Sequence, residues 1–548
     1  MKDERPFYNT PATLSILLLL TLTIAITTLA IRKRGNAEAG KKGVAVPSSS
    51  PLVGSNPPGS QPTSTTEAEL GRLIDQAIDG SEFATARWGV FVVSLRDDRV
   101  LYARNADKLF TPASNMKLYS TAVALDLLGA DYRWRTSLYS RTQPDASGTI
   151  NDDLTLYGRG APDLASKPKR DETNSLAQLA EDLYARGVRH ITGNVIGDES
   201  YFRAEPLGDG WQWNDVQWYF GAEPSALSIN GNEVDLSVQP TNKGGDPPAV
   251  KLNNSDDYVR VSSAIDTVKR GEQLSIGIHR GLSDNEIRVW GEFPTGTRAF
   301  GARLSVHNPA LWAARLLLDA LKSRGIKVDG DAQMRDSRVP ESERFDPSRA
   351  VELAYVSSKP LAEIVKATNK ESINLNAELI LRTLGKERGV MAPDSDTHKA
   401  HERGDDEAGL AVVRLWLNRA GIQTNMLALH DGSGLSRLDL VTPEVTARLL
   451  LAMSRTASAP IFRDSLPAAG QDGTLGGRLR EFKGRVSAKT GSLAYDNSLS
   501  GFATSASGED LAFSIMCNDQ TGRASSVRLI DQIVAILAGY PATAGKHR

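Results

Sequence analysis

The chain has 548 residues, of which 40% are hydrophobic and 24% are charged. This composition excludes a disordered or fibrous chain and predicts a globular protein with room for two to four domains. Because 64 Lys and Arg residues stand against 66 Asp and Glu residues, net charge gives no basis for nucleic-acid binding.

An uncharged apolar run at residues 13–31 is about long enough to cross a bilayer. We interpret residues 1–34 as a signal anchor, with a cleaved signal peptide as the alternative. Basic residues also follow the run, and by the positive-inside rule they conflict with an extracytoplasmic C-terminal part. Residues 35–66 are rich in Pro, Ser, Gly and Thr, which predicts a flexible tether.

The folded part is predicted to begin near Glu67 with the helical pattern EAELGRLIDQAI. Two β-rich runs within residues 88–105 flank an Asp-Asp pair and predict an antiparallel hairpin. A helix follows, because Pro112 suits its start and Gly129 suits its end. Four apolar residues of this helix share one face: Leu118, Ala122, Leu125 and Leu128.

Residues 156–344 alternate short β-like runs with turns rich in Gly, Asn and Asp. They predict a β-rich insertion made of one or two small domains. Helical patterns return after residue 350, and the chain closes on strand-like runs, a hairpin and a last helix. We therefore predict one sheet assembled from distant parts of the chain, within a domain of residues 67–155 and 345–548.

Three short motifs occur in order: Ser114-x-x-Lys117, Ser372-Ile373-Asn374 and Lys489-Thr490-Gly491. None is specific alone, because an S-x-x-K pattern is expected about once or twice in a chain of this length. Two decoys illustrate this: Ser166–Lys169, which a proline interrupts, and Ser228-Ile229-Asn230, which lies in a turn-like setting.

The first two motifs hold the residue types that nucleophilic catalysis needs. A lysine one helical turn from Ser114 reaches its hydroxyl, but a neutral amine at pH 7 costs about 4–5 kcal/mol at the ordinary pKa. Burial and a second cation, Lys489, lower that cost for Lys117. Ser372 is predicted to relay a proton to the leaving group, and Asn374 to hold the substrate amide and the lysine amine.

The third motif is predicted to bind the substrate from an edge strand. Lys489 and Thr490 suit a substrate carboxylate, and Gly491 leaves room for the acyl group against the strand backbone. The backbone amides of Ser114 and Ser492 are predicted to form the oxyanion hole.

The order and settings of the motifs resemble the S-x-x-K, S-x-N, K-T-G signature of penicillin-interacting serine enzymes. From about residue 70 to 540 the chain resembles class C low-molecular-mass penicillin-binding proteins, the D-Ala-D-Ala carboxypeptidase/endopeptidase type. Further landmarks are GRGAPDL, GNVIGDESYF, SALSINGN, DGSGLSR and GQDGTLGGR. The resemblance implies an α/β (α+β) fold: a β-lactamase/transpeptidase-like domain with an antiparallel sheet and a helical cluster, plus the β-rich insertion.

The resemblance also implies an activity. The enzyme removes the terminal D-alanine of peptidoglycan stem peptides, or cuts peptide cross-links, through an acyl-Ser114 intermediate that water releases. β-Lactams are then covalent inhibitors at the same serine, no cofactor is needed, and the enzyme works in the periplasm or at the outer face of the cell membrane. Two alternatives stay open: a β-lactamase or esterase on the same scaffold, and an inactive peptidoglycan-binding or sensor protein.

Other features are interpreted as structural. Asp431 and Asp472 are predicted to form turns. The aromatic cluster WQWNDVQWYF at 211–220 is interpreted as packing within the insertion, with stacking on sugar rings as the alternative. Cys517, the only cysteine, is interpreted as a buried hydrophobe. The charged stretch 392–407 is interpreted as an inserted loop, not as a metal site.

Overall fold

The computed structural model describes residues 65–166, 174–203, 205–241, 246–253, 257–340, 344–389, 404–522 and 524–540. The predicted signal anchor, all but the last residues of the predicted tether and most of the charged stretch 392–407 lie outside these described residues. Within the described ranges, none of the helices has both the length and the apolar character that crossing a bilayer requires.

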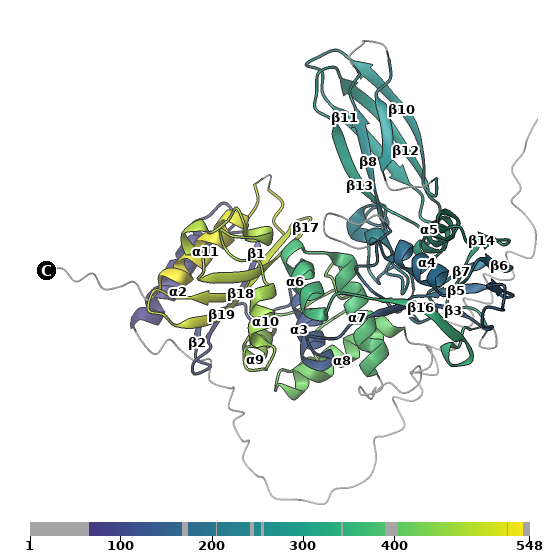
Figure 1. Cartoon of the computed structure of the whole chain (residues 1–548). Helices are drawn as coiled ribbons and strands as arrows, with labels where there is room; N and C mark the ends of the chain where they lie inside the picture. Colours follow the sequence, from purple (N-terminus) through teal and green to yellow (C-terminus); the bar gives the residue numbers. More distant parts are fainter. Residues whose placement is uncertain are drawn as a thin grey trace, which may run out of the picture. The chain divides into compact units, whose positions relative to one another are not determined.

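The N-terminal and C-terminal parts of the described chain meet in one five-stranded antiparallel sheet (Figure 1). Its strands in spatial order are β17 (Val486–Leu493), β18 (Asp496–Thr504), β19 (Asp510–Asn518), β1 (Arg87–Ser94) and β2 (Val100–Arg104). The two predicted hairpins, β1–β2 and β18–β19, are confirmed. Distant parts of the chain form one sheet, as predicted, since Val90 pairs with Ile515.

Both faces of this sheet are covered. Successive side chains of a strand point to opposite faces. Val90 and Val92 therefore pack against α2 (Thr65–Asp79) and α11 (Val527–Gly539), whereas Phe91 belongs to the core on the opposite face. This two-sided burial explains why β1 and β19 are apolar along almost their whole length. The predicted first and last helices are confirmed.

The opposite face packs against a group of helices that we call the helical cluster. Its members are α3 (Met116–Leu128), α6 (Leu361–Glu371), α7 (Asn374–Arg388), α8 (Asp405–Arg419), α9 (Pro443–Met453) and α10 (Ala459–Ser465). Helix α3 ends at Gly129, as predicted. Its burial exceeds the predicted single apolar face, because the other five helices surround it and every side chain from Met116 to Leu125 is buried.

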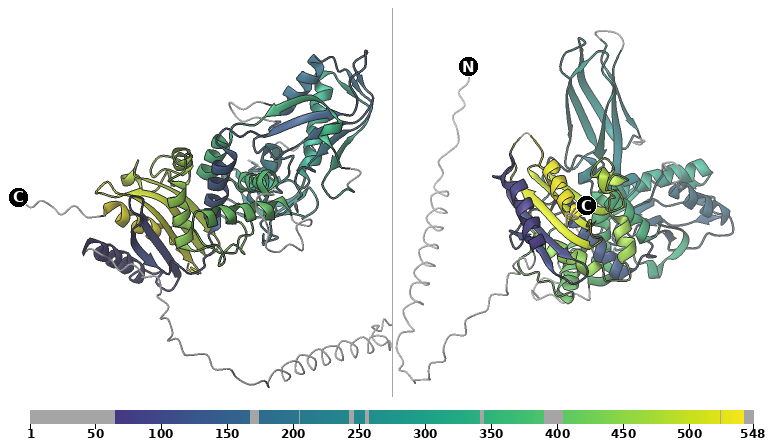
Figure 2. Two further views of the ribbon diagram at one scale, coloured as in Figure 1. Left: turned by 90° about the horizontal axis from the view of Figure 1, so that it is seen from below. Right: turned by 90° about the vertical axis from the view of Figure 1, so that its left-hand side faces the viewer.

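The insertion lies between α3 and α6 and contains four small sheets (Figures 1 and 2). Two of them are made of β14 (Lys327–Val328), β6 (His190–Ile191) and β4 (Thr149–Ile150), and of β15 (Ala332–Arg335), β7 (Val195–Asp198), β5 (Leu154–Tyr157), β3 (Arg135–Ser140) and β16 (Val351–Ser357). The other two are made of β13 (Phe300–Ser305), β8 (Glu233–Gln239) and β9 (Ala249–Asn253), and of β10 (Arg260–Val268), β12 (Glu286–Pro294) and β11 (Ser275–Arg280). One hydrophobic core joins these sheets to α4 (Ser175–Ala185) and α5 (Pro309–Arg324).

The sheet of β5 extends beyond the predicted limits of the insertion, 156–344. Strand β3 pairs with β5, and β16 pairs with β3, although the sequence assigned both to the domain of residues 67–155 and 345–548. An alternating strand pattern does not state which sheet the strand will join, because tertiary packing selects its partner. The division into domains itself stays a prediction.

Candidate active site

A cleft of about 1330 Å³ brings the helical cluster, the insertion and the edge of the five-stranded sheet together. It is lined by Ser114 from the first motif, by Ser372 and Asn374 from the second, and by Ser492 next to the third. The two motif lysines are fully buried. Segments more than 250 residues apart in sequence therefore meet around one space.

Ser114 lies in a single 3-10 turn, Ala113–Asn115, which leads directly into α3. Pro112 precedes this turn, as predicted for a helix start. Ala113 has a φ of 49°, a left-handed conformation that is uncommon for a residue with a Cβ. The Ser114 Oγ lies 3.1 Å from the Lys117 Nζ, so the nucleophile candidate and the base candidate are in hydrogen-bond contact.

Lys117 is held by two further acceptors. Its Nζ donates to Asn374 Oδ1 at 2.6 Å and to the Ser433 carbonyl at 2.7 Å. Burial lowers the pKa of Lys117 from 10.5 to about 8, although the charges of Asp431 and Glu378 raise it. At that pKa a neutral amine at pH 7 costs about 1.4 kcal/mol, against about 4–5 kcal/mol for an ordinary lysine. The side chain is thus suited to accept a proton near neutrality.

Lys489 was predicted to be the cation that lowers the pKa of Lys117, but it is not the main cause of that shift. Burial is the main cause of the lowered Lys117 pKa, and the charges that act most on Lys117 are negative. The repulsion between the two lysines is evident at Lys489, where burial and then the charge of Lys117 hold the pKa well below 10.5. The sequence missed this asymmetry because the acidic neighbours come from other helices and loops.

The second motif forms the corner between α6 and α7. Ser372 ends α6 in a left-handed conformation with φ of 59°, and Asn374 is the first residue of α7. Ser372 and Ile373 thus form a short connection between two helices. The Ser372 Oγ accepts a hydrogen bond from Lys489 Nζ at 2.9 Å, and Asn374 Nδ2 donates to the Phe220 carbonyl at 2.8 Å. The amide of Asn374 therefore joins Lys117 to the insertion.

The third motif lies on β17, which is an edge strand of the five-stranded sheet. The Lys489 Nζ is fully buried and donates to Ser372 Oγ and to the Thr490 carbonyl, both at 2.9 Å. Thr490 Oγ1 donates to Thr474 Oγ1 at 2.8 Å, and Thr474 lines the cleft. Ser492 is exposed at the cleft. The edge of β17 thus brings the hydroxyl groups of Thr490 and Ser492 to the neighbourhood of the cleft.

Gly491 makes room for a different group from the one predicted. A Cβ on this residue would lie 2.7 Å from the Pro112 carbonyl oxygen and 3.1 Å from the Ser114 nitrogen, and it would also collide with Ser498 Oγ. The glycine therefore lets the strand approach the turn of the nucleophile candidate, whereas the sequence predicted room for the acyl group. This approach places the backbone of β17 beside the Ser114 amide.

Asp431 forms a turn, as predicted. Its carboxylate is buried and accepts hydrogen bonds from the backbone nitrogens of Ser433, Gly434 and Ser436 at 3.1, 2.6 and 2.8 Å. The turn presents the Ser433 carbonyl to Lys117, a contact that no motif predicted because backbone carbonyls carry no side-chain signature. The only signal was the landmark DGSGLSR, which contains this turn.

The aromatic segment 211–220 does more than pack within the insertion. Trp218 does pack against the insertion core, as predicted. Trp211, however, donates its Nε1 proton to Asp431 at 2.9 Å, and the ring of Trp213 is 71% exposed. Gln212, Asn214 and Tyr219 line the cleft, so the segment forms part of its wall. The sequence pattern did not reveal this contact with a turn more than 200 residues away.

The two decoy motifs are hydrogen-bonded to each other. Asn230 Nδ2 donates to Ser166 Oγ at 2.8 Å, and the Ser166 nitrogen donates to Asn230 Oδ1 at 2.9 Å. Asn230 begins the turn Asn230–Asn232 before β8, as predicted for that repeat. Lys169 lies outside the described residues.

The other residues interpreted as structural behave as follows. Asp472 accepts a hydrogen bond from the Ala468 nitrogen at 2.8 Å, as expected in a turn, and pairs with Lys370 at 2.7 Å. Cys517 is buried, and burial raises the pKa of its thiol to about 11, which confirms the hydrophobe interpretation. Within the described ranges no group of three His, Cys, Asp or Glu side chains suits a metal ion. The acids and histidines between 392 and 403 lie outside those ranges.

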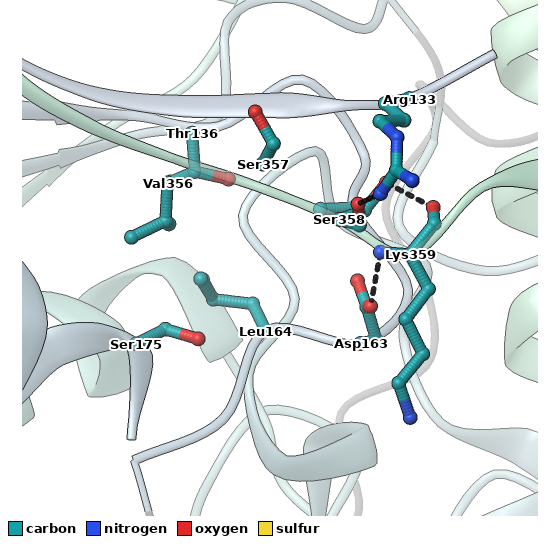
Figure 3. Close-up of a pocket in the computed structure, with 10 residues that line it drawn as sticks. Arg133, Thr136, Asp163, Leu164, Ser175, Val356, Ser357, Ser358 and Lys359 are labelled. Atoms are coloured by element: carbon teal, nitrogen blue, oxygen red, sulfur yellow. Dashed lines mark hydrogen bonds between the residues drawn. The ribbon is translucent and has the colours of Figure 1, made fainter. Parts of the chain in front are cut away.

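A smaller cavity of about 230 Å³ lies beside the cleft (Figure 3). It shares Asp163, Leu164 and Lys359 with the cleft but contains no motif residue. Two of its polar groups are engaged in holding the chain, because Arg133 donates to the Ser358 carbonyl at 2.7 Å and the Lys359 nitrogen donates to Asp163 at 2.8 Å. Motif residues line the cleft and not this cavity.

Comparisons with known proteins show which family the chain belongs to. The family model of the D-Ala-D-Ala carboxypeptidase 3 (S13) family matches residues 70–540. The chain is 32% identical over 502 residues to a D-alanyl-D-alanine carboxypeptidase of Actinomadura sp. (strain R39), covering 89% of this chain and 88% of that protein. It is 26% identical to D-alanyl-D-alanine carboxypeptidase DacB of Haemophilus influenzae, covering 78% and 84% of the two chains.

The fold has a solved counterpart. The crystal structure of penicillin binding protein 4 (dacB) from Haemophilus influenzae matches with a TM-score of 0.70 at 24% identity, covering 85% of this chain and 97% of that one. The predicted β-lactamase/transpeptidase-like fold with an inserted β-rich region is confirmed. Since the family model covers most of the folded sequence, the chain belongs to the D-Ala-D-Ala carboxypeptidase 3 (S13) family and is a serine-type D-Ala-D-Ala carboxypeptidase.

Proposed function

We propose that this carboxypeptidase acts through an acyl-enzyme formed on Ser114, with Lys117 as the base. The observation that carries the proposal is the 3.1 Å contact between Ser114 Oγ and a buried amine whose pKa burial lowers to about 8. Lys117 takes the Ser114 proton as Oγ bonds to the carbonyl carbon of the D-Ala–D-Ala amide. The amide nitrogen then receives a proton by way of Ser372, the C–N bond breaks, and D-alanine leaves.

Water then completes the reaction by attacking the Ser114 ester and returning the hydroxyl. In both halves a negative charge develops on the carbonyl oxygen, and the proposal assigns its stabilisation to the backbone amides of Ser114 and Ser492. Asn374 holds the lysine amine through its Oδ1 and orients the substrate amide. Thr490 and Lys489 bind the terminal carboxylate of the substrate, with Gly491 permitting the close approach of β17 to the Ser114 turn.

The substrate is a peptidoglycan stem peptide ending in D-Ala-D-Ala. The family acts on peptidoglycan, and the cleft of about 1330 Å³ exceeds what a terminal dipeptide fills, which favours cleavage of peptide cross-links as a second activity. Turnover of a D-Ala-D-Ala peptide, measured beside release of bound penicillin, tests the function. Fast penicillin release without peptide turnover would indicate a β-lactamase or esterase. The absence of both penicillin release and peptide turnover would indicate a binding or sensor protein.

A peptidoglycan enzyme acts outside the cytoplasm. We further propose that residues 13–31 anchor the chain to the membrane. We also propose that β-lactams acylate Ser114 itself. In support of the second point, a related structure from Haemophilus influenzae is a complex of penicillin binding protein 4 with a β-lactam.

A chain that starts near Glu67 is expected to keep its penicillin labelling, because the tether has almost nothing to bury. Glu67 itself is buried and pairs with Arg99, so it belongs to the fold. The measurement is fluorescent-penicillin labelling of the purified shortened chain. As a contrast, a chain that starts at residue 80 also loses α2, whose apolar side chains are buried against the sheet, and is expected to unfold. Failure of the first chain to fold would contradict the tether prediction.

Lys489→Ala is expected to weaken turnover of peptides with a free C-terminal carboxylate about 10- to 100-fold more than turnover of an ester substrate that lacks one. Hydrogen bonds to a charged group contribute about 1.5–3 kcal/mol, which corresponds to that ratio. The measurement is kcat/KM on both substrates, with Lys359→Ala, a lysine at the cleft margin, as the matched control. Equal losses on both substrates would instead place the role of Lys489 in its hydrogen bond to Ser372 and in its charge interaction with Lys117.

A further inference from the structure

Three buried carboxyl groups near Lys117 have no part in the proposed reaction. Glu378 lies on α7, and Asp431 and Asp439 lie in the loop between α8 and α9. Their residues are at most 1% exposed. We call these three residues the acid cluster. Burying a charged carboxylate is unfavourable unless donors compensate it, so the donors that each group meets decide which of the three bears the charge.

Asp431 is the member of the acid cluster that accepts the most hydrogen bonds. It accepts the three backbone hydrogen bonds of its turn, and its Oδ2 also accepts from Trp211 Nε1 at 2.9 Å and from Ser433 Oγ at 3.2 Å. These five donors compensate the burial of a negative charge better than the donors at the other two carboxyl groups do.

Glu378 and Asp439 meet far fewer donors. The two oxygens of Glu378 share one backbone donor, the Gly432 nitrogen, at 3.1 and 3.2 Å, and the side chain of Ser433 is the other donor that acts on this carboxyl. Asp439 Oδ1 accepts from the His430 nitrogen at 2.6 Å, while its buried Oδ2 has no donor among the described residues. Burial and the charge of Asp431 raise the pKa of Glu378 to about 8 and that of Asp439 well above its ordinary value.

The acid cluster is connected to Lys117 through the two groups that accept hydrogen bonds from the lysine amine, the Ser433 carbonyl and Asn374 Oδ1. The Ser433 carbonyl belongs to the Asp431 turn, and Asn374 lies one helical turn before Glu378 on α7. The charged groups that face Lys117 are Asp431, Glu378 and Lys489. Those that face Glu378 are Asp431, Asp439 and Arg382. The charge on Glu378 therefore acts directly on the candidate base.

We propose that Glu378 is a positioning residue that stays protonated in the reacting enzyme, so that Asp431 alone supplies negative charge beside Lys117. This inference rests on the proposed role of Lys117 as base. A second carboxylate beside the lysine would hold its proton more tightly, because one opposite charge at close range raises a pKa by about 1–3 units. A neutral Glu378 keeps the hydrogen bond to Gly432 without adding that charge.

The test is the pH dependence of acylation by one β-lactam, compared between the wild type and Glu378→Gln. Glutamine keeps an oxygen acceptor for Gly432 but cannot ionise. Because a protonated Glu378 and a glutamine are both uncharged, we expect the midpoint of the rise in acylation to stay within about 0.3 pH unit of the wild-type midpoint. Asp431→Asn removes the charge that the proposal assigns to the acid cluster, and it is expected to move the midpoint to lower pH by about 1 pH unit.

Glu199→Gln is the matched control. Glu199 is another buried glutamate, whose pKa burial raises to about 7, but it lies in the insertion and is bonded to Ser225. Its substitution is expected to leave the midpoint unchanged. A midpoint that moves to lower pH by about 1 pH unit in Glu378→Gln would show that Glu378 is ionised in the wild type, and it would overturn this proposal alone. A flat wild-type profile would overturn both the base role of Lys117 and the proposal.

A second measurement needs no substitution and covers the case in which Glu378→Gln does not fold. Infrared spectra of the wild-type protein carrying carbon-13-labelled glutamate are expected to show a carboxylic-acid C=O band at about pH 6. Part of this band should persist beyond the titration of Glu199 and disappear as the pH rises through about 8. Absence of a band that titrates in this range would mean that Glu378 is ionised, and the proposal would fail.

Discussion

Ser114→Ala is expected to abolish penicillin labelling and to reduce peptide turnover by at least about 10⁴-fold, the scale for removal of a nucleophile. Ser114 contacts the amine of Lys117, which lies one helical turn further along the same helix, and α3 begins directly after the Ser114 turn. The measurements are fluorescent-penicillin labelling and kcat/KM on a D-Ala-D-Ala peptide.

The matched control is Ser166→Ala, which removes the serine of the decoy S-x-x-K pattern. Its hydroxyl accepts a hydrogen bond from Asn230 and has no contact with Lys117, so labelling is expected to persist. Peptide mapping of the labelled wild type should place the adduct on Ser114. An adduct on Ser166 or Ser372 would overturn the assignment of the nucleophile.

Lys117→Arg is expected to acylate as poorly as Lys117→Ala. Arginine keeps the positive charge and much of the reach, but it does not deprotonate in this pH range and therefore cannot act as base. In the wild type the folded pKa of Lys117 is lowered to about 8, so the neutral, active form is scarce below that pH and dominant above it. The acylation rate should therefore rise as the pH increases through about 8.

The measurement is the acylation rate of the three proteins by one β-lactam across about pH 5 to 10. At pH 7 about one tenth of wild-type Lys117 is neutral for a pKa of about 8, enough for a working base. An arginine variant close to the wild-type rate would show that Lys117 has a structural role only.

The local elements and the order of the motifs could be predicted from the sequence. The hairpin β1–β2, the helix from Pro112 to Gly129 and the final helix α11 each follow from a periodic pattern within a few adjacent turns or residues. The residue types at Ser114 and Lys117 also indicated the chemistry, because their spacing places both side chains on one face of a helix.

The partners of those residues could not be predicted. Lys117 is held by the Ser433 carbonyl, 316 residues away in sequence, and Asn374 is tied to the Phe220 carbonyl in the insertion. Backbone carbonyls have no side-chain signature, and the turns that aim them are set by long-range packing. The membership of β3 and β16 in a sheet of the insertion was missed for the same reason.

By itself, then, the sequence determined the elements, the class of the fold and the identity of the reactive side chains, since these depend on residues close together along the chain. Only the tertiary structure decided the reactivity of those side chains. The lowered pKa of Lys117 comes from complete burial, and the acid cluster beside it joins α7 to a loop about 50 residues further along. Burial and charge are properties of a space enclosed by many segments, so no single stretch of sequence records them.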